Sequence, residues 1–474
     1  MAIPADTVWE VQTTGSDSNG GGFSTASKGA TGVDMTYASP SVVTFTSTLS
    51  GAGGTTLTDS ANGFANTMLG NVINISGQGL YCITAYIGAG SVTVDRALGT
   101  FSTTTGRVGG AHATLTPTLA PGTAFGAAPG NTVWMKAGTY TLTSSVAING
   151  TNTSGASALP ITVNGYASTR GDNGTPPVIT SSTANLDLIT STGNALYFVW
   201  ANLKFTHTGS TRGSAFMLAA ATGADYWQFV RVTADGVLYG MNGNRQPNHM
   251  SWTLCAALNQ TGTYPGTYSS GVFGALYNGS VDGCLVYNNA SPCVTAQNAT
   301  PMIVKRCIFA KNTKGIYQIN TTRTANFLSV DQCTFVDNTG DGFRDDTNSV
   351  SVPMYNQITR CLFWGNGGYG INYPNLTAAQ TAQFAPPISN GFGNNTTADR
   401  NNFPAGSGDV TGVSSDPFIS RAGLNWGLNS GVGAAFRAAG LPGAFGSATT
   451  GYPDIGAVQH QDSGGGVSVI VIED

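Results

Sequence analysis

Acidic side chains gather around one arginine in the segment DNTGDGFRDD, residues 337–346. Clustered carboxylates can hold Ca²⁺, and two carboxyl groups about 5 to 9.5 Å apart can hydrolyse a glycosidic bond. The segment reads as a solvated turn, with a calcium or sugar site and a catalytic group as the alternatives, and it matches no catalytic motif. The candidate glycan-binding residues here are Asp341, Arg344, Asp345 and Asp346.

A weaker glycan-binding candidate is the loop MNGNRQPNHMSW, residues 241–252. Sugar sites place planar polar groups beside an aromatic ring, and this loop offers Arg245, His249 and Trp252 among asparagines. Trp252 falls at an inward position of the repeat described below, so we expect it in the core. Arg245 and His249 remain the candidates.

A further group of charges consists of Asp282, Lys305 and Asp331, each two residues before a cysteine. Because equal positions of a repeat stack, these side chains form either an ion-pair ladder on the outside or part of a carboxylate-bearing groove. The sequence contains no HExxH, P-loop or GxSxG motif. We therefore assign no catalytic residue, and whether the chain is an enzyme stays open at this level.

The strands that must position these groups belong to a repeat that is marked by cysteine. Successive cysteines of this repeat are 29, 23, 26 and 28 residues apart. Periods of about 20 to 50 residues mark solenoids. The cysteine and the residue two places on should point inward, and asparagine follows at the fifth place, where the chain must turn. Stacked asparagines can also bond one another from coil to coil. The repeated residues are Cys255, Cys284, Cys307, Cys333 and Cys361, with Asn289, Asn312, Asn338 and Asn366.

Each repeat reads as three short strands separated by turns, which predicts one coil of a right-handed parallel β-helix, an all-β solenoid. Charged residues are 9% of the 474 residues, against roughly 25% in ordinary globular proteins, and this disfavours solvated helices. We expect the cysteines to be small buried apolar residues. No CxxC pair or histidine cluster accompanies them, so no metal site is expected there.

Two segments carry a resemblance to a known group: NTVWMKAGTYTL (131–142) and ALPITVNGYAS (158–168) look like the first coils of pectate-lyase-like parallel β-helix proteins. Flanking segments VQTTGSDSNGGGF (11–23), SSDPFIS (414–420) and YPDIGAVQ (452–459) resemble the ends of that group. The resemblance implies the fold and leaves activity open, because the group includes lyases, hydrolases, phage tailspikes and adhesins. Lyases of this fold need cations, so Ca²⁺ is a possible cofactor.

The pattern of apolar residues and turns changes between Tyr37 and Leu115, where short strands and glycine turns predict a small separate β-barrel or sandwich. It would serve as an end cap for the solenoid or as a docking module. The expected organisation is a cap strand and start of the β-helix at 1–36, the inserted domain at 37–116 and the β-helix at 117–371. A C-terminal extended segment at 372–462 closes or covers the helix, and a glycine hinge with a terminal strand follows at 463–474.

An apolar stripe should run along the outside of the coils, because the segments CAAL, CLVY, CIFA, CTFV and CLFW put apolar residues at outward positions. Such a stripe is rarely left in water. Either the chain's own segment 372–460 or another subunit would cover it. The terminal strand in SGGGVSVIVIED could add to another chain's sheet or pair with the N-terminal domain. The candidate assembly residues are Leu285, Tyr287, Ile308, Val336, Leu362, Trp364, Val469 and Val471.

Charge and hydropathy exclude some partners. The net charge is −4 without a Lys/Arg run, which disfavours nucleic acid, and no apolar run predicts membrane insertion. We see no signal peptide and expect a location in a virion or at the cell surface or outside the cell. The favoured function is a virion-associated or surface structural protein of tailspike, fibre or capsid-decoration type. It would self-associate or join other virion or surface proteins, and it could bind host polysaccharide. The alternatives are a secreted polysaccharide lyase or glycoside hydrolase, and a bacterial adhesin or filament subunit.

Overall fold

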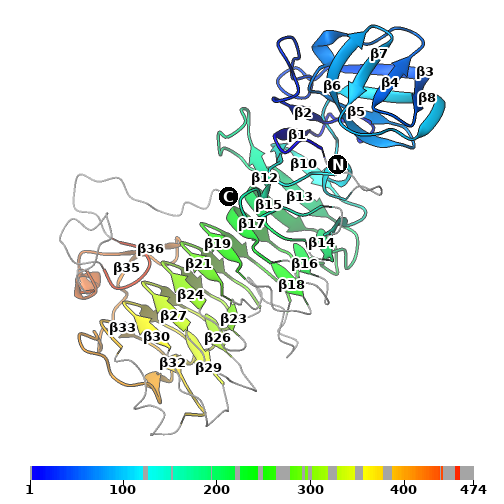
Figure 1. Ribbon diagram of the computed structural model, residues 1–474. Helices are drawn as coiled ribbons and strands as arrows, with labels where there is room; N and C mark the ends of the chain where they lie inside the picture. Colours follow the sequence, from blue (N-terminus) through cyan, green and yellow to red (C-terminus); the bar gives the residue numbers. More distant parts are fainter. Residues whose placement is uncertain are drawn as a thin grey trace. The chain divides into compact units, whose positions relative to one another are not determined.

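A computed structural model describes residues 3–120, 126–150, 153–193, 195–218, 225–243, 249–262, 278–290, 294–296, 302–318, 328–346, 356–376, 387–437, 439–440 and 454–459. The chain divides into two compact units, 1–211 with 217–232 and 212–216 with 233–474. Strands dominate both units (Figure 1). Helical turns in these ranges are α1 (Thr116–Leu119), η1 (Asn66–Met68) and η2 (Val432–Ala435). No helix among the described residues is long and apolar enough to cross a membrane.

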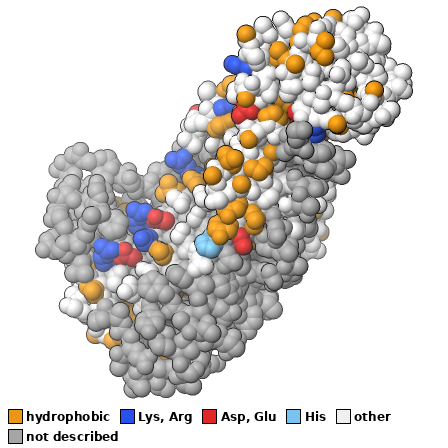
Figure 2. Space-filling view, in the orientation of Figure 1, with side chains coloured by type: hydrophobic (Ala, Val, Ile, Leu, Met, Phe, Trp, Pro, Cys, Tyr) orange, Lys and Arg blue, Asp and Glu red, His pale blue; other side chains and the backbone are white. Residues whose placement is uncertain are grey.

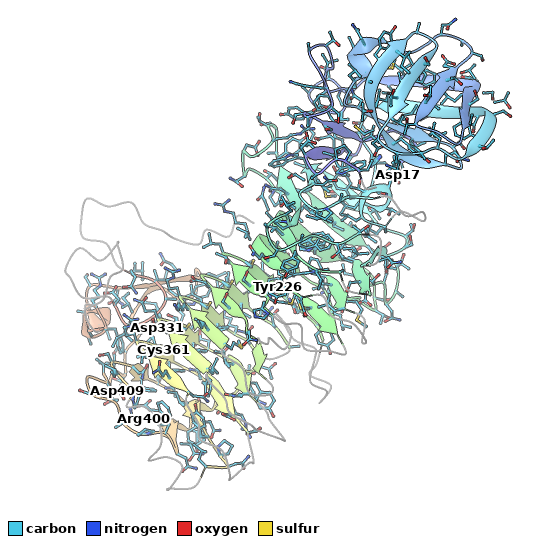
Figure 3. The ribbon with its side chains drawn as sticks, in the orientation of Figure 1. Asp17, Tyr226, Asp331, Cys361, Arg400 and Asp409 are labelled. Atoms are coloured by element: carbon cyan, nitrogen blue, oxygen red, sulfur yellow. The ribbon has the colours of Figure 1, made fainter. Side chains whose placement is uncertain are left out.

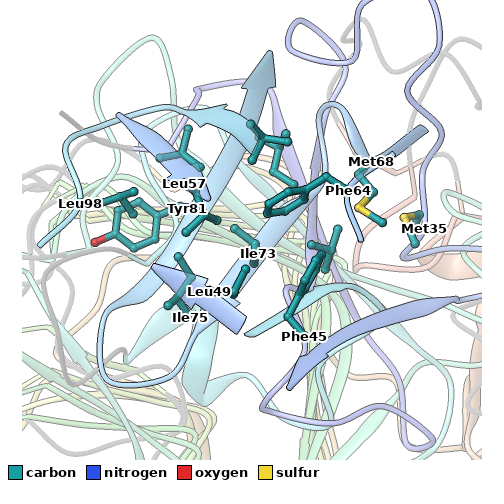
Figure 4. Close-up of a cluster of buried hydrophobic side chains, with 14 residues drawn as sticks. Met35, Phe45, Leu49, Leu57, Phe64, Met68, Ile73, Ile75, Tyr81 and Leu98 are labelled. Carbon is teal, nitrogen blue, oxygen red and sulfur yellow. The ribbon is translucent and has the colours of Figure 1, made fainter. Parts of the chain in front are cut away.

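The inserted N-terminal domain is a closed barrel of six antiparallel strands in the order β3-β4-β7-β6-β5-β8. Alternate residues along its strands point inward, as in β7, where Val92 and Val94 are buried. The buried side chains form one core that includes Phe45, Leu49 and Ile73 (Figure 4). Closure leaves no open sheet edge. The strands are β3 (Val42–Ala52), β4 (Thr56–Asp59), β5 (Val72–Ile75), β6 (Gly79–Gly88), β7 (Ser91–Val94) and β8 (Thr100–Gly109).

The first coils of the solenoid lie in the same unit as the barrel. β1 (Thr7–Val11) pairs antiparallel with β2 (Gly22–Ser24) and parallel with β9 (Thr132–Lys136). The ladder continues through β12 (Ile161–Tyr166) to β15 (Phe198–His207), and Trp9, Val133, Val163 and Trp200 stack in register as buried core. The other strands of these coils are β10 (Thr139–Thr141), β11 (Val146–Asn149), β13 (Val178–Ser181) and β14 (Ile189–Thr192).

The second unit repeats a coil of three strands in parallel register. β16 (Phe216–Leu218) and β17 (Gln228–Asp235) contain residues of both units, and β18 (Met241–Gly243) follows. First strands are β19 (Ser251–Thr253), β21 (Ser280–Asp282), β24 (Met302–Lys305), β27 (Leu328–Asp331) and β30 (Gln357–Thr359). Second strands are β20 (Ala256–Leu258), β22 (Leu285–Tyr287), β25 (Ile308–Ala310), β28 (Thr334–Val336), β31 (Leu362–Trp364) and β33 (Gly391–Gly393). Third strands are β23 (Val294–Ala296), β26 (Ile316–Gln318), β29 (Phe343–Asp345), β32 (Tyr369–Asn372) and β34 (Ala398–Asn401).

The five repeat cysteines stand in a single file inside these coils. The amide of Cys255 lies 3.4 Å from the sulfur of Cys284, and the amide of Cys333 lies 3.5 Å from the sulfur of Cys361. All five cysteines are buried and none of them is in a disulfide. Burial raises the pKa of the Cys284 thiol well above its ordinary value. Beside it, the rings of Phe335 and Phe363 stack with centroids 4.7 Å apart.

The asparagines form a buried amide ladder, but the turn itself is made one residue earlier than the sequence suggested. Left-handed backbone occurs at the preceding residues, for example Asn288 (φ 55°), Lys311 (φ 55°) and Asp337 (φ 54°). The asparagine that follows points inward and donates to the amide oxygen one coil on. The bonds are Asn289 to Asn312 at 2.9 Å, Asn312 to Asn338 at 3.2 Å, and Asn338 to Asn366 at 2.8 Å.

Replacing Asn338 by alanine should lower the free energy of unfolding by about 1–3 kcal/mol, because the Asn312 amide and the Phe309 carbonyl lose buried partners. Urea unfolding followed by circular dichroism measures the change. The control is Thr339→Ala at the exposed neighbouring position, for which a change within about 0.5 kcal/mol is expected. Equal stability of the two variants would show that the ladder contributes nothing.

The apolar stripe is covered by the chain's own C-terminal segment, the first of the two covers that the sequence left open. Leu285, Ile308, Val336, Leu362 and Trp364 are buried there, and Tyr287 is half-buried. The covering side chains are Phe418, Trp426, Leu428, Phe436 and Ile455, from β35 (Phe418–Ser420), β36 (Asn425–Leu428) and the chain beyond them. These stripe side chains therefore pack against side chains of the same chain.

A buried ion-pair network joins the segment before the barrel to the first coils. Glu10 on β1 is fully buried and lies 2.7 Å from the guanidinium of Arg170, which also pairs with Asp34 at 3.1 Å and lies over the Tyr37 ring. Tyr166 donates a hydrogen bond to Glu10. Burial raises the pKa of the Glu10 carboxyl, and the charge of Arg170 opposes that shift. The network therefore depends on Arg170 to keep a buried carboxylate ionised.

The loop that carries Arg170 is fastened by Asp172, whose carboxylate accepts hydrogen bonds from the backbone of Thr169, Ala167, Ser168 and Gly174. These bonds lower the pKa of Asp172 below its usual value. A lowered pKa means that the bonds stabilise the fold above the usual pKa of 3.8, and that this stability is lost as pH falls through the lowered value. We expect the melting temperature of Asp172→Asn to lie below wild type at pH 7, with the difference shrinking at pH 3 and lower. A constant difference over this range would contradict the assignment.

Candidate functional site

The third strands of the second unit bring several charged and polar side chains to one outer face. Tyr317 on β26, Arg344 on β29 and Asn372 on β32 stand at equal positions of parallel register. The side chains alternate along each strand, so Ile316, Phe343 and Ile371 fill the interior. We call the outer group of Lys314, Tyr317, Asp341, Arg344 and Asp346 the Lys314 face.

Arg344 is the centre of the Lys314 face. Its guanidinium pairs with Asp341 at 3.2 Å and with Asp346 at 2.8 Å, and Tyr317 donates from its hydroxyl to Asp346 at 2.9 Å. Asp341 also accepts from the Asn372 amide at 2.9 Å. The face is therefore an ordered set of polar groups in which Asp341 and Tyr317 are buried and Arg344 is half-buried.

Lys314 lies in the turn before β26, with its ammonium 4.0 Å from the centroid of the Tyr317 ring. Burial and the neighbouring Arg344 guanidinium lower the pKa of the Lys314 ammonium from its usual 10.5, while Asp346 and Asp341 oppose the shift. A lysine whose pKa is lowered in this way can act as a proton acceptor. The sequence analysis missed Lys314. Its repeat position would have placed it beside 340–341 of the next coil, where the amide of Gly315 bonds the carbonyl of Asp341.

Three of the four acidic-segment candidates meet on this face, and Asp345 does not. Asp345 points into the solenoid, where it is 2% exposed and accepts from the Asn356 amide at 3.3 Å. The reason is the alternation of side chains on β29, which puts Phe343 and Asp345 inside and Arg344 outside. Asp345 is a buried polar residue of the coil, and its role as a glycan contact is corrected accordingly.

The second glycan-binding candidate is not brought to the Lys314 face. His249 is exposed and has a left-handed backbone (φ 57°). It lies just before β19, which is a first strand and not a third. Trp252 is buried in the core, as expected from its repeat position. Arg245 lies outside the described residues, as do Val469 and Val471 of the terminal strand.

Asp282, Lys305 and Asp331 stack in register, but the two aspartates form ion pairs with arginines outside this column. Asp282 pairs with Arg306 at 2.5 Å, and Asp331 (labelled in Figure 3) pairs with Arg360. Both arginines stand immediately before a repeat cysteine. Among the described residues in Figure 2, acidic and basic side chains are few and several lie in opposite-charge pairs. These pairs organise a turn and leave no carboxylate for chemistry.

The described residues do not fit a Ca²⁺ site. No group of three or more His, Cys, Asp or Glu side chains in the described ranges is arranged to hold a metal ion. The two carboxylates of the Lys314 face, Asp341 and Asp346, are both engaged by Arg344.

Comparison with known proteins agrees with the architecture. Residues 247–382 match the family model described as a right handed beta helix region. Together with the parallel register of the coils, this match identifies the fold as a right-handed parallel β-helix. The right-handed parallel β-helix that the repeat predicted is thereby confirmed. No curated protein matches the chain.

Solved structures of similar fold include three carbohydrate-active proteins. The pectate lyase Pel9A is 15% identical, with 70% of this chain and 88% of that chain covered and a TM-score of 0.48. A rhamnogalacturonan lyase is 12% identical, with 66% and 86% covered and a TM-score of 0.39. The catalytic domain of a GH87 alpha-1,3-glucanase in complex with tetrasaccharides is 11% identical, with 78% and 90% covered and a TM-score of 0.30.

Proposed function

We propose that this chain binds an acidic polysaccharide on the Lys314 face and cleaves it by elimination, with Lys314 as the base. The observation that carries the proposal is the position of Lys314, whose ammonium lies 4.0 Å from the centroid of the Tyr317 ring; burial and the nearby Arg344 guanidinium lower its pKa. Perturbed pKa values of this kind concentrate at functional sites, since catalytic groups need them.

The chemistry follows from the properties of a uronic acid. Its carboxylate acidifies the hydrogen on the adjacent carbon, and a neutral amine at Lys314 can accept that proton. The electron pair forms a carbon–carbon double bond as the bond to the neighbouring sugar's oxygen breaks. That oxygen then takes up the proton, so the base is restored and no water is consumed. The guanidinium of Arg344, close enough to lower the pKa of Lys314, could bind the sugar carboxylate, and the hydroxyl of Tyr317, which donates to Asp346, could accept a hydrogen bond from the sugar.

Binding tests the recognition part of the proposal. Isothermal titration calorimetry with trigalacturonate should show saturable binding to the wild-type chain. Arg344→Ala should weaken it at least about tenfold, the loss of one charge-assisted interaction. Arg306→Ala, which removes an arginine from a first-strand ion pair, should change the affinity less than twofold. The proposal fails if no uronate oligomer binds, or if Arg344→Ala and Arg306→Ala behave alike.

A role as a structural protein of a virion or surface, of spike, fibre or decoration type, remains a prediction. Self-association and a location in a virion or outside the cell also remain predictions. The terminal strand at 463–474, on which part of that expectation depends, lies outside the described residues.

A further inference from the structure

The outer wall of the N-terminal barrel contains an open polar cleft with a volume of about 530 Å³. Strands β3, β8 and β5 form its floor, and the loop after β1 forms one side. Its lining is rich in hydroxyl groups and includes one amide side chain, that of Asn74. The lining residues are Asp17, Ser18, Thr44, Phe45, Thr46, Asn74, Ser76, Thr105, Gly106 and Arg107.

Strand register places the polar groups of the floor side by side. Arg107 on β8 stands opposite Thr44 on β3 and opposite Asn74 on β5. The side chains of Phe45, Ile73 and Val108 at the adjacent positions point into the barrel core. Three neighbouring strands therefore present a guanidinium flanked by a hydroxyl and an amide.

Arg107 is half-buried, and within the described ranges its guanidinium forms no hydrogen bond or ion pair with another side chain. Arg170 and Arg360, in contrast, each hold a carboxylate. A partly desolvated guanidinium favours a planar anion, because its fork of donors matches a carboxylate with two parallel hydrogen bonds. Arg107 is thus an unused anion-binding group in a cleft of suitable size for a sugar.

The one carboxylate in the cleft is already engaged. Asp17 (labelled in Figure 3) accepts hydrogen bonds from the amides of Ala113 at 2.9 Å and Thr114 at 2.8 Å, and from the Thr114 hydroxyl at 2.7 Å. It forms no ion pair with Arg107 among the described residues, since their charged atoms lie beyond 4.0 Å. Asp17 therefore fixes the side of the cleft and leaves Arg107 available.

We propose that this cleft is a second glycan-binding site, which holds the carboxylate of an acidic sugar on Arg107. The hydroxyls of Thr44, Thr46, Ser76 and Thr105 and the amide of Asn74 would bind the sugar's hydroxyl groups. The inference shares with the proposed function only the class of ligand. It uses residues of a different unit, so either site can exist without the other.

The test uses the full chain carrying Arg344→Ala, which weakens the Lys314 face and isolates the cleft. Trigalacturonate should still bind to this chain in calorimetry, and adding Arg107→Ala should weaken binding at least about tenfold. Adding Lys28→Ala instead removes an exposed cation outside the cleft and should leave the affinity within twofold. The carboxyl-reduced, neutral trisaccharide should bind to the Arg344→Ala chain as weakly as trigalacturonate binds to the chain that carries both Arg344→Ala and Arg107→Ala.

Two results would overturn the inference: no binding to the Arg344→Ala chain, or binding that Arg107→Ala leaves unchanged. Both leave the proposed function standing, because that function is judged from Arg344→Ala against wild type. Circular dichroism spectra and melting temperatures equal to those of the parent chain exclude misfolding of the Arg107→Ala variant. The Arg107→Lys variant keeps the charge but loses the two parallel hydrogen bonds of a guanidinium. Its affinity for trigalacturonate should lie between those of the parent chain and the Arg107→Ala variant.

Discussion

Replacing Lys314 by alanine should lower turnover of polygalacturonate by about 10²- to 10⁴-fold, the usual contribution of a positioned general base. The neutral amine is the reactive form, so wild-type turnover should rise as pH rises through the lowered pKa of Lys314. The assay follows the absorbance of the new double bond in the product. Lys314→Arg should be as inactive as Lys314→Ala, because a guanidinium stays protonated.

The matched control is Lys305→Ala in the same coil. Lys305 points outward from a first strand, and among the described residues it forms no ion pair with Asp282 or Asp331. Its removal should leave turnover within about twofold. Equal losses in Lys314→Ala and Lys305→Ala would assign the effect to net charge. Turnover of Lys314→Ala at the wild-type level would show that Lys314 is not the base.

Arg170→Ala should lower the free energy of unfolding of the first unit by about 3–5 kcal/mol, the usual cost of leaving one partner of a buried ion pair alone. Glu10 is fully buried, and Arg170 supplies the positive charge that opposes the burial-driven rise of its pKa. Without Arg170, folding favours protonated Glu10 more strongly. The loss should therefore be largest at pH 8 and smaller at pH 4, since protonation removes the buried charge. Chemical unfolding at both pH values measures it.

A second substitution separates the charge from the packing of the Arg170 stem over Tyr37. In the Arg170→Ala chain, adding Glu10→Gln should recover part of the lost stability at pH 8 because the buried carboxylate is gone. It should recover little at pH 4. A loss below about 1 kcal/mol, or one that does not vary with pH, would show that the ion pair is not what holds this region together.

The coils were predictable because a repeat expresses the same geometry several times. Cys284, Cys307 and Cys333 recur with an apolar residue two places on, and only stacked inward positions require that pattern. The offset of the turn was not predictable, since asparagine occupies both the fourth and fifth places in some coils, as at Asn288 and Asn289. Both can adopt or support a turn, and only the backbone separates them.

The site was harder to predict because its neighbours come from different coils. Lys314 and Arg344 are thirty positions apart in sequence, as their numbers show, and loops of unequal length shift the register between coils. The inward direction of Asp345 could not be predicted from the sequence, because β29 spans only Phe343–Asp345 and three residues do not fix the phase of its side-chain alternation. The cover of the apolar stripe was open for a similar reason: Trp364 needs an apolar partner, and composition does not say which chain supplies it.

The most direct measurement of the central claim is a nuclear magnetic resonance titration of the Lys314 side chain, assigned by comparison with Lys314→Arg. The account predicts that the ammonium loses its proton at a pH below its usual 10.5. It also predicts that the Lys314 signal shifts when trigalacturonate is added. A midpoint at 10.5 or higher, with a signal that the sugar leaves unmoved, would contradict the claim that this amine is prepared for an acidic polysaccharide.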